Sequence, residues 1–198
     1  MDIRKWFSIV EKANNGSAIK SVFPEMNESI NITTHRIYTD GSSINNGKKN
    51  CKGGIGVFFG DNDPRNISKH LETNKVSNNV AELMAGKLGI IKLKETNYKI
   101  GDKIIICTDS EYMINCITKW SNDWEKNGWK RNYLGKLKNI QNLELIKELR
   151  NLVRKNNVSF KHIKAHQVEP THKNSVQYQE WYGNMMADKL ANLGSNII

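Results

Sequence analysis

Apolar residues recur along the chain with two periods, and these periods predict where the strands and helices lie. Short β-branched and aromatic runs predict strands at residues 36–39, 54–59, 66–72, 103–108 and 158–163. Apolar residues three and four positions apart predict helices at residues 77–94, 110–118, 142–155 and 185–193. Three leading strands followed by alternating strands and helices indicate an α/β fold. We expect a mixed five-stranded sheet flanked by helices, with the first three strands antiparallel and the later ones parallel.

Residues 1–34 differ in pattern from the rest of the chain. Trp6, Phe7, Ile9 and Val10 allow one or two turns of amphipathic helix, and residues 24–34 are mostly polar. We therefore expect a leader or docking segment at residues 1–34 and the main domain at residues 35–198.

The charge balance narrows the choice of partner. Thirty Lys and Arg against twenty Asp and Glu give a net charge of +10, which attracts polyanions such as nucleic acid. The same charge also fits a basic protein that is merely well solvated, and composition alone leaves both interpretations open.

Cysteine count and hydropathy bear on the compartment. The three cysteines include no C-x-x-C pair, which argues against a disulfide scaffold and against a cysteine zinc site. We therefore expect an intracellular protein, with cytoplasm and nucleus not distinguished. No apolar run is long enough for a transmembrane helix, and we expect no membrane partner.

Four carboxylates stand out by their positions. Asp40 follows the first predicted strand and Asp109 follows the apolar run of the central one, where open sheets of this type place their ligand sites. Glu82 and Asp188 fall early in predicted helices. Taken singly, each has a structural explanation as a turn, a cap or a residue that favours the helix dipole.

Taken together, the four carboxylates favour a metal site. Clustered carboxylates repel each other unless cations bridge them, and oxygen ligands suit Mg²⁺ or Mn²⁺. Two such ions can activate a water and stabilise the leaving oxygen of a phosphodiester.

The motifs around these carboxylates resemble those of the type 1 ribonuclease H family. They occur in the family's order over residues 35–195: Thr39-Asp40-Gly41-Ser42, Asn78-Asn79-Val80-Ala81-Glu82, Thr108-Asp109-Ser110 and Gly183-Asn184-Met185-Met186-Ala187-Asp188. The resemblance implies a ribonuclease H-like fold and a catalytic domain at residues 35–198. It also implies that Asp40, Glu82, Asp109 and Asp188 bind two Mg²⁺ ions, with Mn²⁺ as an alternative.

By the same resemblance, the chain hydrolyses the RNA strand of RNA–DNA hybrids and leaves 5′-phosphate and 3′-hydroxyl ends. His166 matches the family's mobile histidine, which assists proton transfer or product release. An imidazole suits that work because its ordinary pKa is about 6.5. We expect a monomer.

Residues 119–138 combine basic and aromatic side chains, including three of the five tryptophans. Such a stretch forms either a small satellite core or a groove that tracks a nucleic-acid backbone. It resembles the basic protrusion of cellular ribonucleases H, which grips the DNA strand. The resemblance assigns a deoxyribose channel to Tyr112, Trp120 and Trp124, a DNA phosphate pocket to Lys75, Ser77 and Asn139, and RNA-strand contacts to Asn46, Asn78 and Asn79.

The chain departs from the family pattern in two places. His166 and Asp188 are twenty-two positions apart, a longer gap than is usual, and the extra segment at residues 168–182 allows a lid, a substrate contact or a neutral insertion. His172 is a second candidate for the role of His166. Met185 and Met186 stand where the family usually has acidic residues, which removes charge near the metals.

Two other functions remain open. An exonuclease or transposase-type nuclease on the same fold would carry an Asp-x-Glu pair on the first strand, and Asp40-Gly41-Ser42 lacks it. A catalytically silent hybrid-binding module is the other alternative, and the presence of all four carboxylates argues against it.

Overall fold

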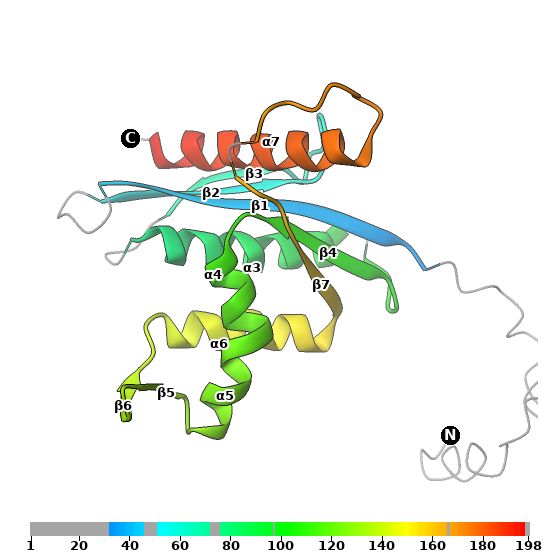
Figure 1. The fold of residues 1–198 in the computed structure, drawn as a ribbon. Coiled ribbons are helices and arrows are strands. Elements are labelled where there is room, and N and C mark those ends of the chain that lie inside the picture. Colours follow the sequence, from blue (N-terminus) through cyan, green and yellow to red (C-terminus); the bar gives the residue numbers. More distant parts are fainter. Residues whose placement is uncertain (1–31, 46–50, 72–75, 97, 166, 197–198) are drawn as a thin grey trace, which may run out of the picture. The chain divides into compact units, whose positions relative to one another are not determined.

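A mixed five-stranded sheet organises the computed structural model (Figure 1), which describes residues 32–45, 51–71, 76–96, 98–165 and 167–196. The strands lie in the order β3-β2-β1-β4-β7. Their bounds are β1 Thr34–Ile44, β2 Lys52–Phe58, β3 Ile67–His70, β4 Lys103–Thr108 and β7 Asn157–His162. The pairs β3–β2 and β2–β1 are antiparallel, whereas β1–β4 and β4–β7 are parallel. The predicted fold class is confirmed.

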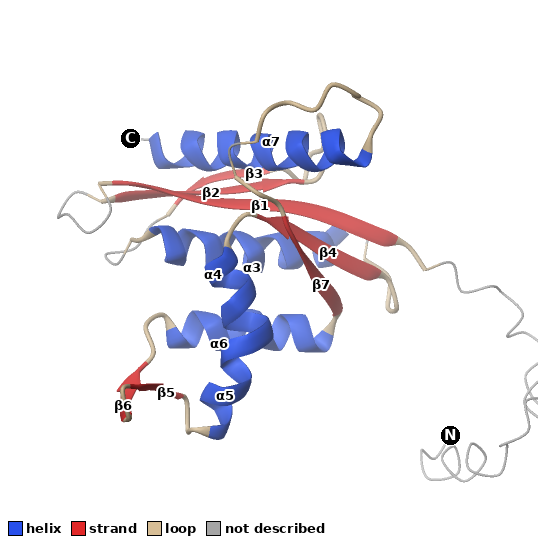
Figure 2. Ribbon diagram, in the orientation of Figure 1, coloured by secondary structure: helices blue, strands red, loops and turns tan. Residues whose placement is uncertain are grey.

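Helices cover both faces of the sheet (Figure 2). Helix α7 (Val176–Asn196) lies along one face against β2 and β1, and α3 (Asn78–Thr96) lies on the other, with α6 (Leu143–Lys155) packed beyond it. Between β4 and α6 the chain forms α4 (Glu111–Asn115), η1 (Cys116–Trp120), α5 (Ser121–Lys126) and a separate hairpin of β5 (Lys130–Tyr133) and β6 (Lys136–Asn139). Among the described residues, no helix is long and apolar enough to cross a membrane.

The core on the α3 side explains why the central strand is so apolar. Ile104 and Ile106 of β4 are fully buried there with Ile37 of β1 and with Leu83 and Ile90 of α3. Burying a side chain of this kind stabilises the fold by about 1.5–3 kcal/mol. A smaller cluster on the α7 side contains Tyr38, Phe58, Cys107, Ile163 and Ala187.

Close backbone contact holds α7 against β2. A Cβ atom on Gly54 would lie 1.9 Å from the carbonyl oxygen of Ala191, so any side chain at this position would push the helix outward. This contact fixes the height of α7 above the sheet and therefore the position of every side chain that α7 carries.

Four differences from the predicted elements matter. β1 runs on to Ile44 because its second half pairs with β2 alone. Helix α7 begins nine residues before the predicted start at Met185, with Tyr178 N–H donating to the Ser175 hydroxyl at its first turn. The hairpin β5–β6 is not predicted by the apolar pattern, because all eight of its residues are exposed. The helix predicted at residues 110–118 continues through η1 and α5 to Lys126.

The segment η1 is a π-helical turn, and its hydroxyl side chains suggest why. The Thr118 and Ser121 hydroxyls donate to the carbonyl oxygens of Ile114 and Ile117, four residues earlier. Such bonds compete with the regular helical ladder and loosen it locally. The wider turn lies between Tyr112 and Trp124 and so sets the relative directions of their side chains.

Candidate active site

Asp40 lies in the part of β1 that extends beyond its pairing with the parallel strand β4. The last pair between β1 and β4 is Tyr38–Cys107, and Asp40 follows two residues later, opposite Gly56 of β2. The prediction that Asp40 ends its strand is wrong, because pairing with β2 continues to Ile44. The carboxylate nevertheless stands at the edge where the parallel part of the sheet stops, which is the position that matters for a ligand site.

Gly41 brings the next carboxylate close to Asp40. A Cβ atom on Gly41 would lie 2.2 Å from the backbone nitrogen of Glu82, so only glycine lets β1 and α3 approach this closely. Glu82 is the fifth residue of α3 and is buried, as is Asp40. The contact between the strand and the helix therefore places two carboxylates side by side.

Asp109 completes the group from the end of β4. The capping role falls to its neighbour, because the Ser110 hydroxyl accepts from the Met113 N–H at the start of α4. The Asp109 side chain is thus left to face Asp40 and Glu82. One carboxylate oxygen from each of these three residues lies within 4.8 Å of the other two, a spacing that suits a bound metal ion.

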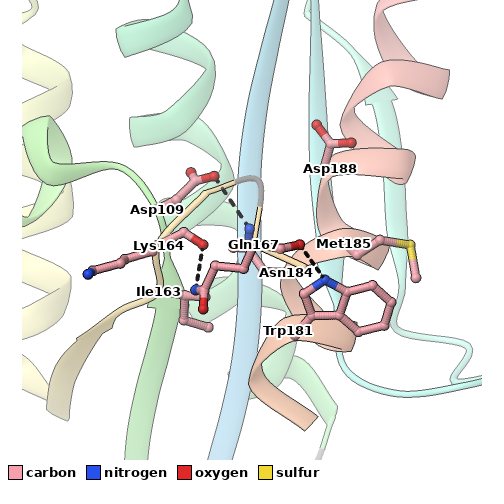
Figure 3. Close-up of a pocket in the computed structure, with 8 residues that line it drawn as sticks. All are labelled: Asp109, Ile163, Lys164, Gln167, Trp181, Asn184, Met185 and Asp188. Carbon is pink, nitrogen blue, oxygen red and sulfur yellow. Dashed lines mark hydrogen bonds between the residues drawn. The ribbon is translucent and has the colours of Figure 1, made fainter. Parts of the chain in front are cut away.

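Asp188 approaches this group from the opposite side of the sheet. It is exposed near the middle of α7, not early in a helix as predicted, and its Oδ1 accepts from the Asn192 amide at 3.1 Å. Asp109 and Asp188 both line a pocket of about 220 Å³ (Figure 3). The structure therefore gathers three of the four predicted ligands and places the fourth at the rim.

Burial and mutual repulsion within this group of carboxylates favour the binding of a cation. Burial, followed by the charges of Asp109 and Asp188, raises the pKa of Asp40 to about 7. Burial and the charges of Asp40 and Asp109 also raise the pKa of Glu82 well above its usual range. The buried Glu82 Oε2 has no hydrogen-bond partner among the described residues. An unpartnered buried carboxylate oxygen and mutually repelling acids fit a divalent cation bound between them.

Three predicted site residues, Asn46, Lys75 and His166, lie outside the described residues. The second candidate for the histidine role, His172, is exposed in the connection before α7. The assignment of either histidine to proton transfer stays a prediction.

The three aromatic residues predicted to form a channel do lie together. The ring centroids of Tyr112 and Trp120 are 6.2 Å apart, and those of Trp120 and Trp124 are 5.8 Å apart. All three line a pocket of about 290 Å³ together with Arg131 and Tyr133 of β5. Trp120 is 40% exposed, so this row of rings forms a surface that a ligand can reach.

The satellite-core alternative also holds in part. Trp124 packs against the main core, and the Trp129 ring lies beneath the side chains of Lys147 and Arg150, with cation-to-centroid distances of 5.2 and 5.6 Å. The stretch therefore combines a small packed unit with a partly exposed aromatic surface.

The other predicted substrate contacts are dispersed along the fold. The Ser77 hydroxyl accepts from the Val80 N–H ahead of α3, whereas Asn139 ends β6 opposite Lys130. Ser77 and Asn139 share no hydrogen bond.

Asn78 and Asn79 are exposed at the start of α3, where the Asn78 amide oxygen accepts from the Ser43 hydroxyl. Their contacts with substrate stay predictions.

The sequence reasoning missed Asn184 and Trp181 as site residues. The Asn184 Nδ2 donates to Asp109 Oδ2 at 3.4 Å, and Trp181 lines the same pocket (Figure 3). Asn184 lies four positions before Asp188 and Trp181 lies seven positions before it, so both share its helix face. The Ser175 cap and the aromatic spacing after it were the available signal, because a helix that starts at residue 176 puts these residues beside the carboxylates.

The fold and the carboxylate group define a class of α/β protein with a candidate metal site, and comparison with known proteins narrows the class. The family model described as RNase H matches residues 33–196. Ribonuclease H of Schizosaccharomyces pombe is 39% identical over 160 residues, covering 81% of this chain and 52% of that protein. Ribonuclease H of Hahella chejuensis is 32% identical over 163 residues, covering 82% of this chain and 94% of that protein.

Solved structures agree on the fold. The prototype foamy virus protease–reverse transcriptase matches with a TM-score of 0.62 at 25% identity, over 82% of this chain and 21% of that one. The chain belongs to the ribonuclease H family. It spans about half the length of the S. pombe and mouse relatives, at 52% and 53%. The division of the chain at residue 34 stays a prediction.

Proposed function

We propose that the chain is an endoribonuclease that hydrolyses the RNA strand of RNA–DNA hybrids, leaving 5′-phosphate and 3′-hydroxyl ends. The observation that carries the proposal is the group of buried Asp40 and Glu82 with half-buried Asp109, whose oxygens lie within 4.8 Å of one another. Family membership supports the choice of substrate. The silent-module alternative is disfavoured because a binding module gains nothing from holding three repelling carboxylates together with two of them buried.

The metal chemistry follows from the ligand set. Asp40, Glu82, Asp109 and Asp188 would hold two Mg²⁺ ions, or Mn²⁺ in their place. When bound, such a pair supplies an activated water and charge stabilisation for the leaving oxygen of a phosphodiester. Burial of Asp40 and Glu82 excludes water from one side of the site, and the Asn184 amide orients Asp109 from the other.

Substrate binding falls to the exposed surfaces around this site. The row of Tyr112, Trp120 and Trp124 with Arg131 beside it offers flat faces and positive charge to the DNA strand. Asn78 and Asn79 offer amides to the 2′-hydroxyls of the RNA strand. Lys75, Ser77 and Asn139 would hold a DNA phosphate, Asn46 would contact the RNA strand and His166 would assist proton transfer. The enzyme would act as a monomer inside the cell.

Cleavage by wild-type protein and an Asp109→Asn variant tests the proposal. With Mg²⁺ and end-labelled RNA–DNA hybrid, the substitution should lower kcat at least about a thousandfold. An amide is a weaker ligand than a carboxylate for the metal ions whose charge stabilises the transition state. Asp63→Asn is the matched control, since it makes the same chemical change at a residue that pairs with Arg65 between β2 and β3. It should leave kcat unchanged.

Parallel reactions with double-stranded RNA and single-stranded RNA define the substrate. The proposal expects cleavage of the hybrid alone. Equal cleavage of all three substrates, or full activity of Asp109→Asn, would overturn it.

A further inference from the structure

The pocket beside the metal ligands has a second wall that the proposed chemistry does not use. Asp109 and Asp188 form its acidic end, and Trp181, Met185 and Gln167 form the other (Figure 3). Lys164 also lines the pocket, but its ammonium group points away from Trp181 in this view. A half-buried tryptophan thus lies next to a group of carboxylates, in the same continuous space.

Trp181 is held in place on two sides. Its Nε1–H donates to the carbonyl oxygen of Gln167 at 3.0 Å, and the Gln167 side chain donates back to the Lys164 carbonyl oxygen at 2.8 Å. The Tyr178 ring packs on Trp181 with a centroid distance of 5.5 Å. The indole is therefore fixed before any ligand arrives, which lowers the entropy cost of a contact made through its face.

Asn184 links this wall to the metal ligands. It lies one turn after Trp181 on α7, is buried, and donates to Asp109 through Nδ2. Its Oδ1 is buried and has no partner among the described side chains and backbone. An unpartnered acceptor next to an aromatic wall is a feature that a hydroxyl-bearing ligand would satisfy.

We propose that Trp181 is a substrate-contact residue, whose ring face holds the nucleotide of the RNA strand next to the scissile phosphate. The inference rests on the proposed function, and it assigns a role to the end of the extra segment at residues 168–182. A nucleotide presents a flat base and an apolar sugar face beside a phosphate, which matches an aromatic surface beside a metal site. Contact at this point would fix where the strand crosses the carboxylates.

Two substitutions separate the possible roles of Trp181 in the full chain. Trp181→Leu removes the flat face, and we expect it to raise KM for the hybrid about tenfold while kcat stays within about threefold of wild type. Trp181→Phe keeps a flat face but loses the N–H that holds Gln167, and we expect KM within about threefold of wild type.

The control is Tyr182→Phe, on the same helix but facing away. The Tyr182 hydroxyl donates to Asp61 at 2.7 Å, and its ring packs on Phe58. This change should leave KM and kcat unaltered. Urea unfolding of each variant identifies any loss of the fold itself.

Two further measurements do not depend on steady-state rates. Fluorescence anisotropy with labelled hybrid in EDTA, in the Asp109→Asn background, should show the tenfold loss of affinity for Trp181→Leu without metal or turnover. On end-labelled hybrid, Trp181→Leu should also spread cleavage over more positions than wild type, because the strand is less firmly placed.

The outcomes are distinct. Unchanged KM, affinity and cleavage positions in Trp181→Leu would overturn the proposed contact. Equal losses of affinity in Trp181→Leu and Trp181→Phe would also overturn it, because they would show that Trp181 only holds the loop at Gln167. Absence of hybrid cleavage by wild-type protein would refute the proposed function, whereas the anisotropy measurement would still decide whether Trp181 contacts the hybrid.

Discussion

The metal centre and the basic protrusion (residues 119–138) are held to the fold in opposite ways. Asp40 and Glu82 lie within the packed layers of β1 and α3, at a contact so close that Gly41 has no room for a Cβ atom. The protrusion, by contrast, exposes every residue of its hairpin, contacts α6 through Trp129 against Arg150, and reaches the main core through Trp124. The proposed metal ligands are thus held in the core, and the surface proposed to contact nucleic acid lies on a satellite.

The largest expected effect comes from breaking the core contact. Gly41→Ala would force a Cβ atom to within 2.2 Å of the Glu82 nitrogen, and backbone at this point has no free space to give. We expect a loss of about 4 kcal/mol or more in the free energy of unfolding, at the exceptional end for one substitution, with loss of cleavage. Urea unfolding and the hybrid assay measure both.

Gly60→Ala is the matched control, because a Cβ atom there meets nothing within 4 Å. It should be close to neutral. Equal stability of the two variants would contradict the claim that glycine at position 41 sets the spacing of the carboxylates.

A pH series sharpens the electrostatic side of the comparison. In the metal-free chain burial raises the pKa of Asp40 to about 7, so the folded state keeps a proton that the unfolded state loses near pH 4. Between these values the folded state binds more protons, and the contribution of Asp40 to stability therefore falls as pH rises from about 4 to about 7. The fall should reach up to about 4 kcal/mol, measured by urea unfolding in EDTA.

Asp40→Asn should reduce that slope, because the amide does not titrate and only the contribution of Glu82 is left. Saturating Mg²⁺ should also reduce it, since a bound cation replaces the proton between the carboxylates. A metal-free wild-type chain that gains stability from pH 5 to pH 8, with Asp40→Asn following the same curve, would show that burial does not raise the pKa of Asp40.

The smallest expected effect tests the attachment of the protrusion. Arg150 is buried and donates to the Ser121 carbonyl oxygen and the Asn122 amide oxygen, and it pairs with Glu125 at 3.0 Å. Arg150→Ala should cost about 2 kcal/mol of stability, because it leaves these partners unsatisfied. It should also weaken hybrid binding while kcat at saturation is retained.

Arg154→Ala removes a cation from the same Glu125, but Arg154 is 56% exposed. Its cost should stay below about 1 kcal/mol. Similar losses of stability and hybrid affinity in the two variants would show that the buried network has no special part in positioning the protrusion.

The sheet and the positions of Asp40 and Asp109 could be predicted because they depend on strong local patterns, whereas Glu82 and Asp188 were named mainly from the family resemblance. The apolar run before Asp109 marks a central strand, and parallel neighbours end at one edge. The start of α7 was missed because Gln177, Tyr178 and Trp181 are not a regular apolar stripe, and this part of the helix packs on the sheet through Tyr182, against Phe58 of the distant β2.

The hairpin was missed for a different physical reason. Lys130–Tyr133 and Lys136–Asn139 bury neither face, so no alternation exists to detect. Leu134 and Gly135 both have positive φ at its turn, and leucine gives little warning of that conformation. The buried Asn184 beside Asp109 likewise depends on the height of α7 over the sheet, which no local pattern encodes.

The packing of α7 on β1 and β2 also has a consequence for the order of events during synthesis. The Ser42 hydroxyl donates to the Asn192 amide oxygen across 150 positions of sequence, and Asp188 lies in the same helix. A ribosome adds about 5–20 residues per second, so Asp40, Glu82 and Asp109 emerge several seconds before the helix that brings the fourth carboxylate. A growing chain therefore carries an incomplete set of the proposed metal ligands, and the set is complete only after the last helix has packed.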